Sequence, residues 1–115
     1  MSKLPFGTLQ DFHKNLNKRK VILFGAGPIS QKTARKINHE YNFLTDNNSN
    51  MWNTIEKNKK ILNPEEIKNK KNDFFFIICS TSFIDIVGQL ESYGYIQTED
   101  FIISPILNDL RVISD

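Results

Sequence analysis

Short apolar runs recur along the chain, and polar or amphipathic segments separate them. Short runs that are rich in Ile, Leu, Val and Phe predict strands. The expected strands are Lys20–Phe24, Asn42–Asp46, Lys60–Leu62, Asp73–Cys79 and Phe101–Ile103. The run Asp73–Cys79, DFFFIIC, is the most apolar and shows no polar alternation, which is typical of a strand buried on both faces.

The segments between these runs carry apolar residues three or four positions apart, which is the period of a helix. They predict helices over residues 8–19, 28–41 and 83–93, and a short one that begins at 64. We expect Thr8, with Asp11 three residues on, and Ser82 to cap their helices, and Gly94 to end the last helix. The polar stretch 47–58 is expected to be rich in turns.

Strands that alternate with helices predict an α/β fold. We expect a three-layer, Rossmann-like parallel sheet of four to five strands, with helices on both faces. By analogy with dinucleotide-binding folds the strand order should be 3-2-1-4-5, with Lys60–Leu62 as the third strand. Residues 1–115 are expected to form a single domain, in which a nucleotide-binding core, 20–107, follows an N-terminal helical extension, 1–19.

The turn Gly25-Ala26-Gly27-Pro28-Ile29-Ser30 follows a predicted strand and opens a predicted helix. This is the context of the Gly-x-Gly-x-x-Gly phosphate-binding fingerprint. Gly25 would allow the tight turn, and Gly27 would let a pyrophosphate approach the free N–H groups of the helix. Ser30 replaces the third glycine and Pro28 removes one donor, so the match is incomplete.

Two further features converge on this turn. Asp46 ends the second strand, 21 residues after Gly25, where a carboxylate can accept hydrogen bonds from ribose and disfavours a 2′-phosphate. Ser80-Thr81-Ser82 ends the strand expected beside the first. The alternative is a plain turn that binds nothing, because Asp-Asn-Asn is also a common turn sequence. The expected site residues are Gly25, Ala26, Gly27, Pro28, Ile29, Ser30, Asp46, Asn47, Ser80, Thr81 and Ser82.

The remaining chemistry-bearing residues favour structural roles. His13 and His39 lack partners at metal-ligand spacing, so no metal is expected. Cys79 lies in the most apolar run and is interpreted as an inert core thiol. Trp52 could stack on a base, although packing at the sheet edge is the simpler interpretation. Catalytic residues stay unidentified, because no Tyr-x-x-x-Lys pair and no Ser-His-Asp arrangement is evident.

Charge and composition restrict the partners. Fifteen basic and thirteen acidic residues give a formal charge of +2, which does not favour nucleic acid as a partner. No apolar run approaches the roughly 20 residues of a membrane span, so membrane insertion is not expected. A single cysteine and no leader-like start predict a soluble, cytoplasmic protein.

The stretches VILFGAGPISQKTARKI, FLTDNNSNMW, KKILNPEEI and DFFFIICSTSFIDIVGQLESYGY follow in one order. In this order they resemble the small Rossmann-like nucleotide-binding domain of bacterial surface-polysaccharide biosynthesis proteins. That family includes N-terminal domains of sugar-nucleotide dehydratases and epimerases and of sugar acetyltransferases. The resemblance implies that the Gly-rich turn binds NAD or the nucleotide of a sugar.

Three functions follow as expectations. The first is a domain that binds NAD or a nucleotide-sugar in cell-surface polysaccharide metabolism. The second is an NAD-dependent enzyme, or enzyme subunit, that modifies a sugar nucleotide. The third is a non-catalytic scaffold with a vestigial site. The expected partner is a nucleotide-containing small molecule, with a homodimer or a sugar-modifying enzyme as protein partner. Coenzyme A and S-adenosylmethionine stay open as ligands because they too use Gly-rich turns.

Overall fold

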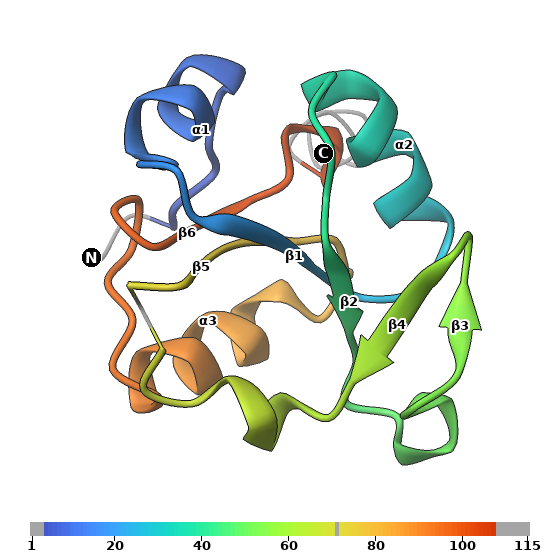
Figure 1. Ribbon diagram of the computed structural model, residues 1–115. Helices are drawn as coiled ribbons and strands as arrows, with labels where there is room; N and C mark the ends of the chain where they lie inside the picture. Colours follow the sequence, from blue (N-terminus) through green and yellow to red (C-terminus); the bar gives the residue numbers. More distant parts are fainter. Residues whose placement is uncertain (1–3, 71, 108–115) are drawn as a thin grey trace.

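Strand β1 (Lys20–Phe24) lies at the centre of a six-stranded sheet, between β2 (Phe43–Thr45) and β5 (Phe74–Ile78) (Figure 1). The computed structural model describes residues 4–70 and 72–107. The outer strands are β3 (Ile55–Glu56), β4 (Lys59–Leu62) and β6 (Phe101–Ile103). The strand order is β3-β4-β2-β1-β5-β6, and every pair is parallel except β3 with β4.

Helices cover both faces of the sheet, which confirms the α/β class (Figure 1). Alternate side chains of β1 point to opposite faces because successive residues of a strand do so. Ile22 and Phe24 join the cluster under α3 (Phe83–Ser92), whereas Val21 and Leu23 join the cluster under α1 (Leu9–Asn15) and α2 (Pro28–Ile37). Burying each such side chain contributes about 1.5–3 kcal/mol.

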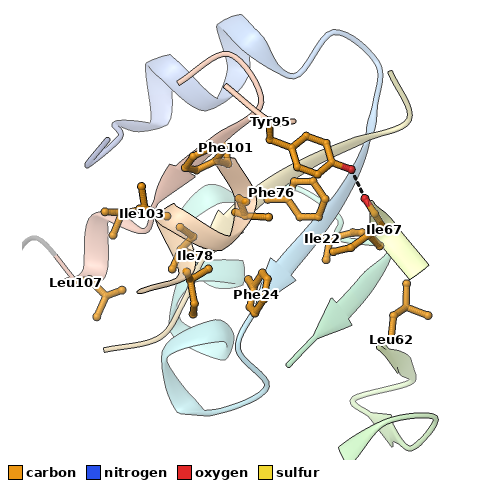
Figure 2. Packing of buried hydrophobic residues seen from close by; sticks show 13 residues of the cluster. Ile22, Phe24, Leu62, Ile67, Phe76, Ile78, Tyr95, Phe101, Ile103 and Leu107 are labelled. Carbon is orange, nitrogen blue, oxygen red and sulfur yellow. Dashed lines mark hydrogen bonds between the residues drawn. The ribbon is translucent and has the colours of Figure 1, made fainter. Parts of the chain in front are cut away.

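A buried tyrosine ties the short 3₁₀ helix η2 (Pro64–Ile67) to the segment after α3 (Figure 2). The Tyr95 hydroxyl donates to the Ile67 carbonyl and accepts from the Lys70 amide at 3.1 Å. Its ring packs edge-on against Phe76, with 4.7 Å between the ring centroids. Burial raises the pKa of Tyr95 above its ordinary value, so this hydroxyl remains a donor at neutral pH.

The expected strand count of four to five is wrong, and the strand order differs from 3-2-1-4-5 by one additional edge strand. Strand β3 lies inside the stretch 47–58, which was expected to be rich in turns, and it forms a hairpin with β4. Lys57 and Asn58 link the two strands with φ angles of 52° and 66°, which suits a tight hairpin turn. A two-residue strand gives no hydrophobic period, and lysine is not a residue that signals such a turn.

Two helices end earlier than the sequence predicts. Helix α1 begins as expected, because the Thr8 hydroxyl accepts from the Asp11 amide at 3.1 Å in a capping box. The helix ends at Asn15, although the hydrophobic pattern predicted that it would continue to residue 19. It stops early because Asn17 and Lys18 adopt φ angles of 50° and 62°, which are not helical. Helix α2 likewise ends at Ile37, since Asn38 adopts the left-handed conformation. The spacing of apolar residues continues past Asn15 and past Ile37, so it does not indicate where either helix ends.

The outer edge of β6 is covered by residues 5–7. Phe6 forms a parallel bridge with Ile103, whose amide donates to the Pro5 carbonyl at 2.7 Å. Gly7 lies against Ile102 so closely that a Cβ atom would be 2.5 Å from a side-chain carbon of Ile102. Glycine at position 7 therefore allows this segment to pack against the sheet and to hydrogen-bond with the backbone groups at the outer edge of β6.

We predict opposite effects of alanine at two glycines. Gly7→Ala should lower the free energy of unfolding by about 1–3 kcal/mol, because the new methyl group overpacks against Ile102. Gly88→Ala should raise it by about 1 kcal/mol, since Gly88 lies within α3 with open space around it and alanine favours helix. Urea unfolding followed by circular dichroism measures both changes. A Gly7→Ala protein as stable as the wild type would contradict the packing described for residues 5–7.

Candidate functional site

The Gly-rich turn starts directly after β1, where Gly25 lies beside Cys79 at the end of β5. Gly25 has a φ angle of +119°, and its amide donates to the Thr45 carbonyl at 2.8 Å. A Cβ atom at Gly25 would lie 2.8 Å from the Cys79 carbonyl oxygen. Both the backbone conformation and the close approach require glycine. This turn therefore brings the carboxyl ends of β1, β2 and β5 together.

Gly27 occupies a different environment from Gly25. It is the N-cap of α2 with a φ angle of −134°, which any residue can adopt, and a Cβ atom would meet nothing within 4 Å. A serine, aspartate or asparagine here could cap the helix, but Gly27 provides no side-chain cap. Within residues 4–70 and 72–107, the amides of Gly27 and Ile29 donate to no group of the protein. Open space and two unpaired donors thus lie together at the start of α2.

Asp46 lies beside this turn at the end of β2. Its Oδ2 accepts from the Ala26 amide and its Oδ1 accepts from the Asn48 amide, both at 2.9 Å. Its backbone carbonyl accepts from the Trp52 indole N–H at 2.7 Å. A carboxylate has about four acceptor sites, so each oxygen retains capacity for another donor. The carboxylate is therefore held in place at the edge of the turn.

Two adjoining cavities open at these strand ends. The larger, about 240 Å³, is bordered by the Gly25–Ile29 turn, Cys79 and Thr81. The smaller, about 100 Å³, is bordered by Asn47, Ser82 and Ile86. Both cavities share Gly25, Asp46 and Ser80 as borders. The fold thus brings together all the expected site residues except Ser30.

Ser30 does not lie at the cavities, and Ser82 does not make the capping hydrogen bond that the sequence predicted. Ser30 is buried, and its hydroxyl donates to the Gly27 carbonyl at 2.6 Å, so it packs the start of α2 and does not face either cavity. Ser82 is the N-cap residue of α3, as expected, but its side chain makes no capping hydrogen bond. Instead the Ser82 amide donates to the Ser80 hydroxyl at 3.1 Å. This bond shapes the loop that borders both cavities.

Comparison with protein-family models gives a match over residues 17–102 to the family described as C2185-like, N-terminal. The chain belongs to this family. No curated protein matches the chain. Among solved structures, the chain is similar to the crystal structure of RSP, a Rex-family repressor, with a TM-score of 0.54 and 13% sequence identity. The match covers 84% of this chain and 57% of the repressor chain, and at this identity it shows the shared fold alone.

The family match corrects the resemblance to polysaccharide-biosynthesis domains, which was wrong. The features that carried it were a Gly-x-Gly turn, an acidic residue after the second strand and an apolar strand before a helix. Many doubly wound sheets with a ligand crevice share these features, because the physics of the strand-to-helix turn demands them. They therefore identified a type of fold and could not identify a family.

Cys79 borders the larger cavity of this C2185-like domain but is only 3% exposed. Burial raises the pKa of its thiol to about 12, although a hydrogen bond with Thr33 acts in the opposite direction. The thiol donates to the Ile77 carbonyl at 3.5 Å. A thiol in this environment is protonated at neutral pH, which supports the interpretation of Cys79 as a packing residue.

Sequence spacing did not reveal two contacts made by the fold. His13 and His39 lie on separate segments, yet their ring centroids are 6.3 Å apart and both rings pack edge-on against Phe12. Gln89 on α3 exchanges two hydrogen bonds with Asn47, although 42 residues separate them. No local pattern signals either contact, because both depend on how the helices pack on the sheet.

Among residues 4–70 and 72–107, no group of three His, Cys, Asp or Glu side chains is placed to hold a metal ion. None of the helices that the structure describes is both long and apolar enough to cross a membrane.

The two glycines of the turn should respond differently to alanine. Gly25→Ala should lower the free energy of unfolding by more than about 2 kcal/mol. The new Cβ atom would clash with the Cys79 carbonyl oxygen, and alanine would be strained at the positive φ angle of this position. Gly27→Ala should change it by less than about 1 kcal/mol, since its backbone is ordinary and the space is open. Urea unfolding of both variants checks this. Equal losses at the two positions would contradict the described turn.

Cys79 should resist alkylation in the folded protein. A pKa raised from 9.0 to about 12 leaves about a thousandfold less thiolate at pH 8 than an ordinary thiol has. Iodoacetamide labelling followed by mass spectrometry should therefore be negligible in buffer and complete in urea. Rapid labelling of the native protein at pH 8 would show that Cys79 is accessible.

The same thiol should make the free energy of unfolding fall as pH rises above about 9. Its pKa is higher in the folded protein than in the unfolded chain, so the unfolded chain loses this proton first.

Proposed function

We propose that this domain binds a nucleotide whose diphosphate lies on the Gly25–Ile29 turn and whose ribose lies at Asp46. The observation that carries the proposal is Gly27. Neither its backbone angle nor its neighbours require a glycine, and a capping residue would stabilise α2 better. A ligand that approaches the backbone at this point gives a reason for the missing side chain.

The start of α2 supports a phosphate at this position. The free amides of Gly27 and Ile29 can donate to phosphate oxygens, and the positive end of the helix dipole favours a negative charge. Neither cavity is bordered by lysine or arginine among the described residues. Backbone groups would therefore supply the phosphate contacts, which requires the close approach that Gly27 allows.

Asp46 supports an unmodified ribose. Its two oxygens are oriented by the Ala26 and Asn48 amides and can accept from ribose hydroxyls. A 2′-phosphate would bring a like charge to the same carboxylate, so NAD or a nucleoside diphosphate fits better than NADP.

The proposed role is recognition rather than bond-making. Among the described residues, the titratable groups that border the cavities are Asp46, which holds two backbone amides, and Cys79, whose pKa is raised by burial. The similar solved structure is that of a repressor, so the fold occurs in a protein with a regulatory role. Ligand binding without chemistry is consistent with such a role.

Titration calorimetry with NAD, NADP, ADP and UDP tests the proposal. The wild type should bind NAD or a nucleoside diphosphate, and NADP should bind at least tenfold more weakly. Gly27→Val should abolish detectable binding, because its side chain fills the space above the turn, while the protein stays folded. Asp46→Asn should weaken binding about tenfold, since it removes a charged acceptor.

Gly88→Ala is the matched control, because it alters a glycine on α3 that borders neither cavity. It should bind as the wild type does. The proposal is wrong if no nucleotide binds at millimolar concentration, or if a folded Gly27→Val protein binds as tightly as the wild type.

A further inference from the structure

Two amide side chains form a hydrogen-bonded pair beside the smaller cavity, which Asn47 borders. Asn47, in the loop after β2, donates from Nδ2 to Gln89 Oε1 at 2.9 Å, and Gln89 Nε2 donates back to Asn47 Oδ1 at 2.9 Å. Asn47 borders the cavity, and Gln89 lies on α3 one turn after Ile86, which also borders it. We call this pair the Asn47–Gln89 clasp.

A chain of hydrogen bonds fixes the orientation of the clasp. Gln89 Nε2 also donates to the Tyr93 hydroxyl at 2.9 Å, and that hydroxyl donates to Glu65 Oε2 at 3.4 Å. The Glu65 carboxylate forms an ion pair with Lys68 at 2.9 Å, so it can only accept. Tyr93 must then accept from Gln89, which sets the nitrogen and oxygen positions of both amides.

In the clasp, the Asn47 amide is hydrogen-bonded through its carbonyl oxygen and through the N–H group on the same side. This is the edge with which asparagine pairs with N6 and N7 of adenine. The Gln89 amide presents the same donor and acceptor to Asn47 that adenine would present. In the described structure, Gln89 thus makes with Asn47 the two hydrogen bonds that an adenine edge would make.

The cavity that Asn47 and Asp46 border is small. The smaller cavity, about 100 Å³, is well below the roughly 300–1,000 Å³ of ordinary ligand sites. The clasp bonds are solvent-exposed and join neutral groups, and such bonds are readily exchanged for other partners. A base could therefore displace Gln89 and enter between the β2 loop and α3.

We infer that the Asn47–Gln89 clasp opens when the nucleotide binds, and that Asn47 then pairs with the edge of an adenine base. The inference rests on the proposed function, because the diphosphate and ribose place the base beside Asn47. Asn47 is the contact residue, and Gln89 and Tyr93 are positioning residues that hold its amide in the free protein. Guanine fits less well, since its N7 and O6 are both acceptors, so one of them would face the Asn47 carbonyl oxygen with no donor between them.

Calorimetry with ADP and GDP tests the clasp, because the two ligands share ribose, diphosphate and ring size. The wild type should bind ADP at least tenfold more tightly than GDP. Gln89→Met removes the competing amide at similar size and should bind ADP about three- to tenfold more tightly, with the preference retained. Asn47→Ala should bind ADP and GDP within twofold of each other and still depend on Gly27.

Tyr93→Phe provides a second variant that keeps the ring beneath Lys68, 5.0 Å from its Nζ atom, and removes only the hydroxyl that orients Gln89. It should also bind ADP more tightly than the wild type does. The inference is overturned if neither Gln89→Met nor Tyr93→Phe tightens ADP binding, or if Asn47→Ala keeps the preference for ADP. Gly27-dependent binding without a base preference would overturn the clasp alone, whereas the absence of any nucleotide binding would overturn the proposed function with it.

Discussion

The close approach of Gly25 to the end of β5 determines the geometry of the whole candidate site. At this point the chain leaves β1 with a φ angle of +119°, passes within contact distance of the Cys79 carbonyl and hydrogen-bonds to Thr45 at the end of β2. Three strand ends therefore converge on one turn. The two hydrophobic clusters, one on each face of the sheet, hold those strands in register. The core thus fixes the place from which Asp46 and the start of α2 face the cavities.

The site combines rigid and unfilled parts. Asp46 is rigid because both of its oxygens accept backbone amides, and Gly25 is rigid because no other residue fits. Gly27 is unfilled, since space and unpaired amides lie beside it. The Asn47–Gln89 clasp is intermediate: its orientation is defined, but its bonds are exposed. If the proposed nucleotide binds here, its phosphate and ribose would meet preorganised groups and its base an adjustable one, which suits selective binding at low ordering cost.

Much of this arrangement could be predicted from the sequence. Apolar runs defined the five parallel strands, and the spacing of Gly25, Asp46 and Ser80 placed them at one edge of the sheet. The short strand β3 and the early end of α1 depend on non-glycine residues at positive φ, which hydrophobic periods do not encode. The clasp depends on tertiary packing between segments 42 residues apart. The family was identified wrongly because the Gly-rich turn, the acidic residue after the second strand and the apolar strand occur in many families that share this fold.

Nuclear magnetic resonance titration of the ¹⁵N-labelled protein with ADP and NAD tests the central claim most directly. The account predicts saturable shifts of the Gly27 and Ile29 amide signals, together with that of Ala26, whose amide is bonded to Asp46. The Lys20 amide, which donates to the Asp73 carbonyl at the start of β1, away from the turn, should not shift and serves as the internal reference. Shifts confined to residues away from the Gly25–Ile29 turn, or no saturable shift with either nucleotide, would contradict it.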